Sequence, residues 1–289
     1  MGEPGPDFEA RPPVGLFAHD HPDTECDGWS TPLLTLRFAT VRGAKHRYHR
    51  QPRQDAARAA VHEPTGSTVF AVADGVSSAS HAELGAAEAC RAAVRRMLEL
   101  LSRQPGPVDL RDVAHHAASQ LGELAQWQTG GREPEPGEVA GLYATTLVFG
   151  VAHSDSAGHT VDIGSVGDSG AWVLDLAGST YRALFASKTG SDSSVVSNEV
   201  RPLPRVPDPL PQVRVRPVPG QAVLIGTDGF GDPLGDGDGP VGALFARNLG
   251  APEPPSPPWL AHLLDFSKET FDDDRTLLAI WPRAGASAP

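Results

Sequence analysis

The chain has 289 residues and a formal net charge of −12, which disfavours a nucleic-acid-binding surface as its main role. Its length fits one domain of about 200–250 residues with loosely ordered ends. Two cysteines, no run of about 18 apolar residues and an acidic, proline-containing N-terminus predict a cytoplasmic protein without disulfides, membrane segments or membrane partners, which we expect to be a monomer.

The predicted elements run from a leader to a short tail. Residues 1–30 are rich in proline, glycine and aspartate, so we expect a partly disordered leader, then a folded domain at 31–282 and a tail at 283–289. The spacing of apolar residues predicts strands at 33–41, 56–62 and 68–73, helices at 84–101 and 110–127, strands at 144–152, 161–166, 171–176, 181–186, 213–218 and 222–227, a helix at 259–268 and a strand at 276–281. Strands in blocks, with a pair of helices between them, favour an α+β sandwich over alternating βαβ units.

Two connections carry expectations of their own. The segment 187–210 is polar and rich in proline, without clear periodicity, and is long enough to form a flap near a site. The pair Pro219-Gly220 predicts a turn that joins the strands at 213–218 and 222–227 into a hairpin.

Four aspartates stand at the edges of apolar, strand-like runs. Asp74, Asp168 and Asp228 each follow such a run, and Asp273 precedes the last one. Because strand ends are held rigidly, carboxylates placed there can converge on one point, as a hard divalent cation requires. Aspartate beside glycine after an apolar run is also a common turn signal, so each of these residues taken alone is more often only a turn.

Six short motifs follow one another along the chain: Gln54-Asp55, Val72-Ala73-Asp74-Gly75, Ala144-Thr145-Thr146, Gly167-Asp168-Ser169, Thr227-Asp228-Gly229 and Asp273-Asp274-Arg275-Thr276. In their order and approximate spacing, from residue 35 to about 282, they resemble the metal-dependent protein phosphatase 2C family, in a divergent bacterial branch. The resemblance implies a four-layer α/β/β/α sandwich, with a central pair of antiparallel β-sheets flanked by helices.

The resemblance also implies a set of metal ligands. Asp74 would bridge two Mn²⁺ or Mg²⁺ ions, with the backbone carbonyl of Gly75 on the first ion. Asp228 and Asp273 would hold the second ion, and Asp168 would help to bind a third, weaker one. Oxygen-only ligands, without histidine or cysteine at metal spacing, select Mg²⁺ or Mn²⁺ over Zn²⁺ on chemical grounds as well.

Further catalytic residues are implied in the same way. Asp55 would orient the attacking water, and we count it with Asp74 and Asp228 as catalytic. Arg50 lies five residues before Asp55, which is the spacing of an arginine that often binds the substrate phosphate in the family. A guanidinium can bind phosphate through two nitrogens, although a solvated arginine in a basic loop is the alternative.

The proton donor is left open. Val76 replaces a histidine that some eukaryotic members use as a general acid, so protonation of the leaving group needs water, His81 or His46. No cysteine lies in a phosphate-cradling loop, and no Gly-x-Ser-x-Gly elbow or P-loop motif occurs. The residues therefore favour direct attack by a water held between two ions about 3.5–4 Å apart.

These features predict metal-dependent hydrolysis of phosphoserine and phosphothreonine in proteins. The expected partners are phosphorylated proteins and Ser/Thr kinases, and no nucleic acid. Two alternatives stay open: a phosphatase of small phosphorylated molecules, and a pseudophosphatase that binds a phosphoprotein or a kinase without turnover. The joint presence of Asp74, Asp228 and Asp273 argues against the pseudophosphatase, since a binding module has no need of three ligands for two ions.

Overall fold

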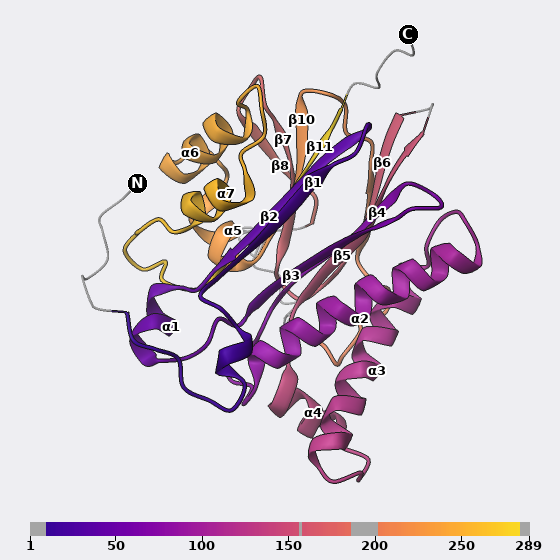
Figure 1. Ribbon diagram of the computed structural model, residues 1–289, viewed down its shortest axis with the longest axis vertical. Coiled ribbons are helices and arrows are strands. Elements are labelled where there is room, and N and C mark those ends of the chain that lie inside the picture. Colours follow the sequence, from indigo (N-terminus) through magenta and orange to yellow (C-terminus); the bar gives the residue numbers. More distant parts are fainter. Residues whose placement is uncertain (1–9, 156–157, 186–201, 284–289) are drawn as a thin grey trace, which may run out of the picture.

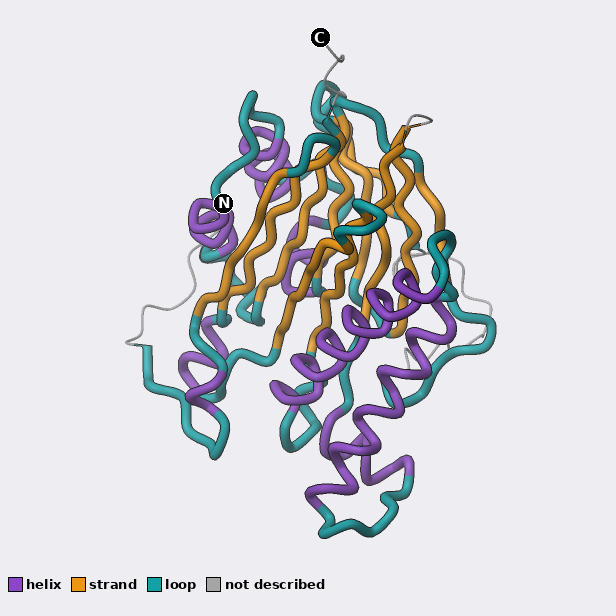
Figure 2. The backbone as a smooth tube through the Cα atoms, turned by 45° about the vertical axis from the view of Figure 1, so that its right-hand side comes forward, coloured by secondary structure: helices purple, strands orange, loops and turns teal. Residues whose placement is uncertain are grey.

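The computed structural model describes residues 10–155, 158–185 and 202–283. Two antiparallel sheets lie face to face, and helices cover the outer face of each sheet (Figure 1, Figure 2). One sheet has the strand order β1-β2-β11-β10-β7-β8, and the other has the order β3-β4-β5-β6-β9. The predicted α/β/β/α sandwich is therefore confirmed.

Eleven strands make up the two sheets within the described residues. The six-stranded sheet contains β1 (Thr24–Ser30), β2 (Leu34–Val41), β11 (Arg275–Pro282), β10 (Gln221–Gly226), β7 (Gly170–Asp175) and β8 (Thr180–Ala183). The five-stranded sheet contains β3 (Asp55–His62), β4 (Ser67–Asp74), β5 (Leu147–Asp155), β6 (Gly158–Val166) and β9 (Gln212–Val215).

The helices fall into two groups on opposite sides of the sandwich (Figure 1). The five-stranded sheet is covered by α2 (Ala82–Arg103) and α3 (Leu110–Gln128), with α4 (Pro136–Tyr143) beside them. The six-stranded sheet is covered by α5 (Asp228–Leu234), α6 (Pro240–Leu249) and α7 (Pro257–Leu264). A 3₁₀ helix (Ala18–Asp20) and the short α1 (Ala44–His49) lie near the N-terminal end of the described chain.

Strand β4 shows how one strand contributes to two cores. Val69, Ala71 and Ala73 pack against α2 and α3, whereas Phe70 and Val72 point into the space between the sheets. This follows from the strand's geometry, since successive side chains point to opposite faces of a sheet. Strands β10 and β11 alternate in the same way between the inter-sheet core and the core under α5, α6 and α7. A slip of one residue would exchange the two faces, so the register is strongly specified.

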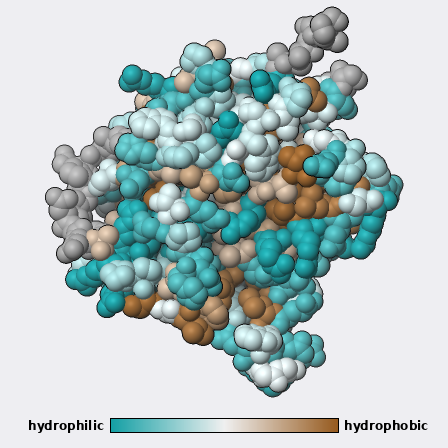
Figure 3. Space-filling view, viewed as in Figure 1, coloured by the Kyte–Doolittle hydropathy of each residue, from teal (hydrophilic) through white to brown (hydrophobic). Residues whose placement is uncertain are grey.

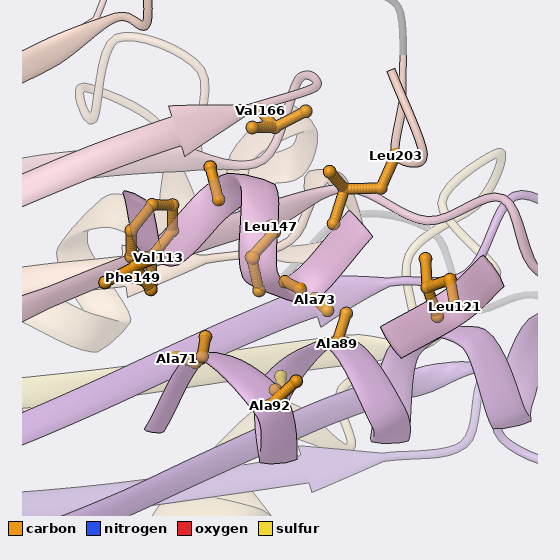
Figure 4. Close-up of a cluster of buried hydrophobic side chains, with 14 of the residues drawn as sticks. Ala71, Ala73, Ala89, Ala92, Val113, Leu121, Leu147, Phe149, Val166 and Leu203 are labelled. Carbon is orange, nitrogen blue, oxygen red and sulfur yellow. The ribbon is translucent and has the colours of Figure 1, made fainter. Parts of the chain in front are cut away.

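Alanine dominates the contact between α2 and the five-stranded sheet. Ala71 and Ala73 of β4 lie in one cluster with Ala89 and Ala92 of α2 (Figure 4). Such small side chains let the helix approach the strands closely. A larger residue would overpack this contact at a cost of about 1–3 kcal/mol.

The fold begins earlier than the sequence predicts. Strand β1 lies inside the expected leader and pairs antiparallel with β2 along its whole length. Glu25 of β1 forms ion pairs with Arg53 and Arg58, at 3.0 and 2.6 Å. An edge strand needs only one neighbouring strand and is only half-buried, so its composition resembles that of a loop.

The predicted hairpin at Pro219-Gly220 is wrong. Strand β9 pairs with β6 in one sheet, whereas β10 pairs with β7 and β11 in the other. Gly220 does turn the chain, with φ of 93°, but the connection crosses between sheets. A turn signal reports local reversal and cannot report which sheet each flanking strand joins. Residues 186–201, most of the expected flap, lie outside the described part of the chain.

Candidate metal centre

The predicted site residues lie where strands of both sheets end. Strand β3 begins at Asp55 and β4 ends at Asp74, and these two residues are directly paired across the strands. Asp168 lies between β6 and β7, Asp228 is the first residue of α5 directly after β10, and Asp273 precedes β11. The two sheets therefore bring their aspartates to a common edge of the sandwich.

Close backbone packing holds Asp74 and its neighbours. Thr146 accepts the backbone N–H of Asp74 through Oγ1 at 2.9 Å and donates its own N–H to the Asp74 carbonyl at 2.8 Å. A Cβ on Gly75 would clash with the backbone of Ala82, and a Cβ on Gly167 would clash with Thr146. Glycine is therefore required in both motifs for the chain segments to meet.

The gathered carboxylates repel one another in the absence of a cation. The carboxyl groups of Asp74 and Asp228 influence each other's pKa directly. Burial raises the pKa of Asp74 well above its usual value, and the charges of Asp55, Asp228 and Asp273 raise it further. Burial also raises the pKa of Asp228, to which Asp168 and Asp273 contribute. Buried carboxylates this close together are the environment that a divalent cation with oxygen ligands neutralises, so the residues fit Mg²⁺ or Mn²⁺.

Asp55 is held in one orientation from the opposite sheet. Its Oδ2 accepts hydrogen bonds from the hydroxyls of Thr227 and Thr276, each at 2.8 Å. Burial is the main cause that raises the pKa of Asp55, followed by the charge of Asp274. The two threonines lie at the end of β10 and the start of β11, so this carboxylate links the two sheets at the site.

Asp274 and His46 form a buried pair that no local sequence pattern predicts. His46 Nδ1 lies 2.9 Å from Oδ1 of Asp274. Burial alone would raise the pKa of Asp274, but His46 and the backbone N–H groups of Gly43 and Gln54 lower it overall. Burial alone would lower the pKa of His46, but the neighbouring Asp274 carboxylate outweighs burial, so the pKa of His46 is raised. The side chain of His46 is only 1% exposed, which removes it from consideration as a proton donor to substrate.

His46 lies beside one of the expected metal ligands. His46, Asp273 and Asp274 each offer a possible ligand atom, and these atoms lie within 4.8 Å of one another. The sequence predicted no histidine at metal spacing, because His46 and Asp273 are far apart along the chain. The structure brings them together through α1, which occupies the segment read as a basic loop.

Arg50, the predicted phosphate contact, points towards the N-terminal segment. Arg50 caps the C-terminus of α1 with a left-handed φ of 61°, is exposed, and donates from Nε to the carbonyl of Pro12 at 3.4 Å. Lys45 Nζ lies 3.8 Å from Oδ2 of Asp273. His81, the second candidate proton donor, lies 3.8 Å from Glu83. The structure therefore gathers the five aspartates, and it directs Arg50 towards the N-terminal segment.

The fold and the gathered carboxylates define the class of metal-dependent phosphatases. More specifically, the chain belongs to the protein phosphatase 2C family, whose model matches residues 42–265. No curated protein sequence matches the chain significantly.

Solved structures agree with the fold. The catalytic domain of the serine threonine protein phosphatase PstP, in complex with two manganese ions, matches with a TM-score of 0.58 and 16% identity, over 87% of this chain and 99% of that one. RsbX in complex with magnesium matches with a TM-score of 0.54 and 11% identity, over 90% and 100%. The phosphatase MsPP from Mycobacterium smegmatis, in complex with cacodylate, matches with a TM-score of 0.54 and 17% identity, over 86% and 98%. At these identities the structures support the shared fold.

Proposed function

We propose that this chain hydrolyses phosphoserine and phosphothreonine in proteins, with water as the attacking group and divalent ions as cofactors. The observation that carries the proposal is the meeting of Asp74, Asp228 and Asp273 at one edge of the sandwich, with the pKa of Asp74 and Asp228 raised by burial and mutual repulsion. Membership of the family supports the reaction class. PstP, a structural neighbour described with two manganese ions, supports the choice of metal.

Each carboxylate has a distinct place in the proposed reaction. Asp74, Asp228 and Asp273, together with the carbonyl of Gly75, would hold two ions, and Asp168 would help to hold a third. When bound, Mn²⁺ or Mg²⁺ supplies the positive charge that lowers the pKa of a water and attracts the phosphoryl oxygens.

The remaining steps fall to residues around the ligands. Asp55, kept in place by Thr227 and Thr276, orients the attacking water by accepting a hydrogen bond. Arg50 stays the predicted phosphate contact, and its alanine variant tests that prediction. The leaving group takes its proton from solvent water or from His81, because His46 is buried against Asp274 and Val76 has no proton to give.

Several finer expectations belong to the same proposal. We expect phosphorylated proteins as substrates, a Ser/Thr kinase as the opposing enzyme, a cytoplasmic location and a monomeric state. None of the helices in the described residues is long and apolar enough to cross a membrane. On the face shown in Figure 3 hydrophilic residues predominate and hydrophobic ones form separate patches.

The test is a phosphatase assay with two substrates, an aryl phosphate and a phosphothreonine peptide. We expect Mn²⁺-loaded wild type to hydrolyse both, and EDTA or Asp74→Asn to reduce turnover by more than the about 10–100-fold that loss of an outer partner of a metal ligand costs. Asp162→Asn is the matched control, since Asp162 pairs with Arg214 on strands β6 and β9, outside the site.

Three outcomes decide between the candidate functions. Equal turnover by wild type and Asp74→Asn would refute the proposal. Hydrolysis of the aryl phosphate without any phosphoprotein or phosphopeptide would point to a phosphatase of small molecules. Unchanged activity of Arg50→Ala would remove Arg50 from the site.

A further inference from the structure

The first turn of α1 is docked on the segment that carries Asp273. The N–H of Lys45 donates to the carbonyl of Asp272 at 3.0 Å. Gly43 lies so close to the Asp273 backbone that a Cβ on this glycine would clash with it. The backbone around Asp273 is therefore fixed by α1, while the carboxylate itself is 42% exposed and has its two oxygens 3.8 Å from Lys45 Nζ and from His46 Nδ1.

Asp274 adds hydrogen bonds that fix the same segment. Its Oδ1 accepts the N–H of Gly43 and its Oδ2 accepts the N–H of Gln54, each at 2.6 Å, and the side chain is 2% exposed. Burial of a carboxylate is costly unless its oxygens are satisfied, so these donors are a condition for the arrangement. Because Asp274 follows Asp273 and Gln54 precedes Asp55, one buried side chain holds the backbone of two site residues.

His46 completes the arrangement through one of its two ring nitrogens. Nδ1 lies 2.9 Å from Oδ1 of Asp274 and 3.8 Å from Oδ1 of Asp273. Both ring nitrogens are buried and neither meets hydrogen-bond geometry with a described residue, but only Nδ1 lies within ion-pair distance of the two carboxylates. The ring therefore contacts both neighbouring carboxylates through Nδ1.

We propose that His46 and Asp274 form a positioning pair, which holds Asp273 in the orientation that it needs as a metal ligand. The inference rests on the proposed function, because it takes Asp273 as a ligand. Partners that orient a ligand typically contribute about 10–100-fold to metal affinity. Loss of the pair therefore weakens Mn²⁺ binding by about that factor.

Substitutions at His46 separate the two ring nitrogens. The amide nitrogen of asparagine occupies roughly the position of Nδ1, whereas that of glutamine occupies roughly the position of Nε2. Because the contacts are made by Nδ1, we expect His46→Asn to retain most of the Mn²⁺ affinity. We expect His46→Gln and His46→Leu to lose about 10–100-fold.

Asp274→Asn tests the other member of the pair. The substitution preserves the shape of the side chain but replaces one acceptor oxygen with an NH₂ group. That group must face the N–H of either Gly43 or Gln54, whichever way the amide turns. We expect the same loss of Mn²⁺ affinity, and this variant carries the test together with His46→Gln should His46→Leu fail to fold.

The measurement is the Mn²⁺ dissociation constant of each folded variant by calorimetric titration, with thermal unfolding in EDTA as a separate measure of stability. His62→Leu is the matched control, since His62 is also buried but lies at the opposite end of β3 from Asp55, where its ring nitrogens contact Thr65 and Ser102. We expect this control to lose thermal stability without losing Mn²⁺ affinity.

The outcomes keep the inference and the proposed function apart. If wild type binds no Mn²⁺, the proposed function fails. If wild type binds Mn²⁺ and His46→Leu, His46→Gln and Asp274→Asn bind it equally well, only the positioning role fails. A directly bonded nitrogen in the pulsed electron paramagnetic resonance spectrum of bound Mn²⁺ would also overturn it, since His46 would then be a ligand.

Discussion

Thr227 allows a quantitative test of the network that orients Asp55. Its Oγ1 donates to Oδ2 of Asp55 at 2.8 Å and accepts the N–H of Thr276 at 3.1 Å. Valine has nearly the same shape, so Thr227→Val removes both hydrogen bonds without creating a cavity. An ordinary hydrogen bond contributes about 0.5–1.5 kcal/mol, and a buried N–H left unpaired costs about 1–3 kcal/mol. We therefore expect the free energy of unfolding to fall by about 3 kcal/mol.

Thr68 provides the matched control. It is fully buried in β4, and its Oγ1 has no hydrogen-bond partner within the described ranges. Thr68→Val removes an unsatisfied hydroxyl, so we expect unchanged or higher stability. Urea unfolding of both variants in EDTA measures the difference. A Thr227→Val protein as stable as wild type, or an equal loss at both positions, would refute the reasoning.

Two further predictions concern a thiol and the metal. Burial raises the pKa of the Cys90 thiol to about 12, whereas Cys26 is only partly buried. We therefore expect a disulfide reagent at mild pH to modify Cys26 in the native protein and Cys90 only after unfolding. Modification of Cys90 in the native protein would contradict this prediction. Burial is the main cause that raises the pKa of Asp74 and Asp228, and neighbouring charges raise it further. Above the pKa of about 3.9 that an aspartate has in the unfolded chain, the folded metal-free protein therefore binds more protons than the unfolded chain. Its stability falls as pH rises through the raised pKa values. Mn²⁺ needs ionised carboxylates, so it raises Tm more near about pH 7.5 than near about pH 5.5. At 100 times its dissociation constant, Mn²⁺ adds about 2.7 kcal/mol to the free energy of unfolding. Equal increments at both pH values, measured by thermal unfolding with Mn²⁺ and with EDTA, would argue against this linkage.

The layers of the fold could be predicted because strand signals are local. Residues 68–73 alternate between two apolar faces, and the observed β4 differs from that range by one residue at each end. The short helices α1, α4, α5 and α6 could not be read in the same way. α4 contains Gly137 and Gly141, and α5 contains Pro233, so tertiary packing overrides weak helix propensity there.

The site residues, too, divide into those that local sequence patterns predict and those that depend on contacts between distant segments. Asp74, Asp228 and Asp273 were recognisable because each stands at a strand end, and strand ends of both sheets meet at one edge. The pair of His46 and Asp274 depends on contact between segments more than 200 residues apart, for which no local pattern exists. The spacing to Asp55 and the phosphate-binding chemistry of a guanidinium predict Arg50 at the site, but the left-handed end of α1 carries its side chain to Pro12.

Strand β1 decides where a shortened form of this protein can begin. Arg53 is 2% exposed, donates to the backbone carbonyl of Asp55 and takes Glu25 as its carboxylate partner. A fragment that starts at residue 31 would remove the carboxylate partner of this guanidinium, which donates to the backbone of the site residue Asp55. It would also expose β2 as a bare hydrophobic edge that invites pairing between molecules. Expression of an active catalytic domain therefore requires the N-terminal segment that composition alone would discard.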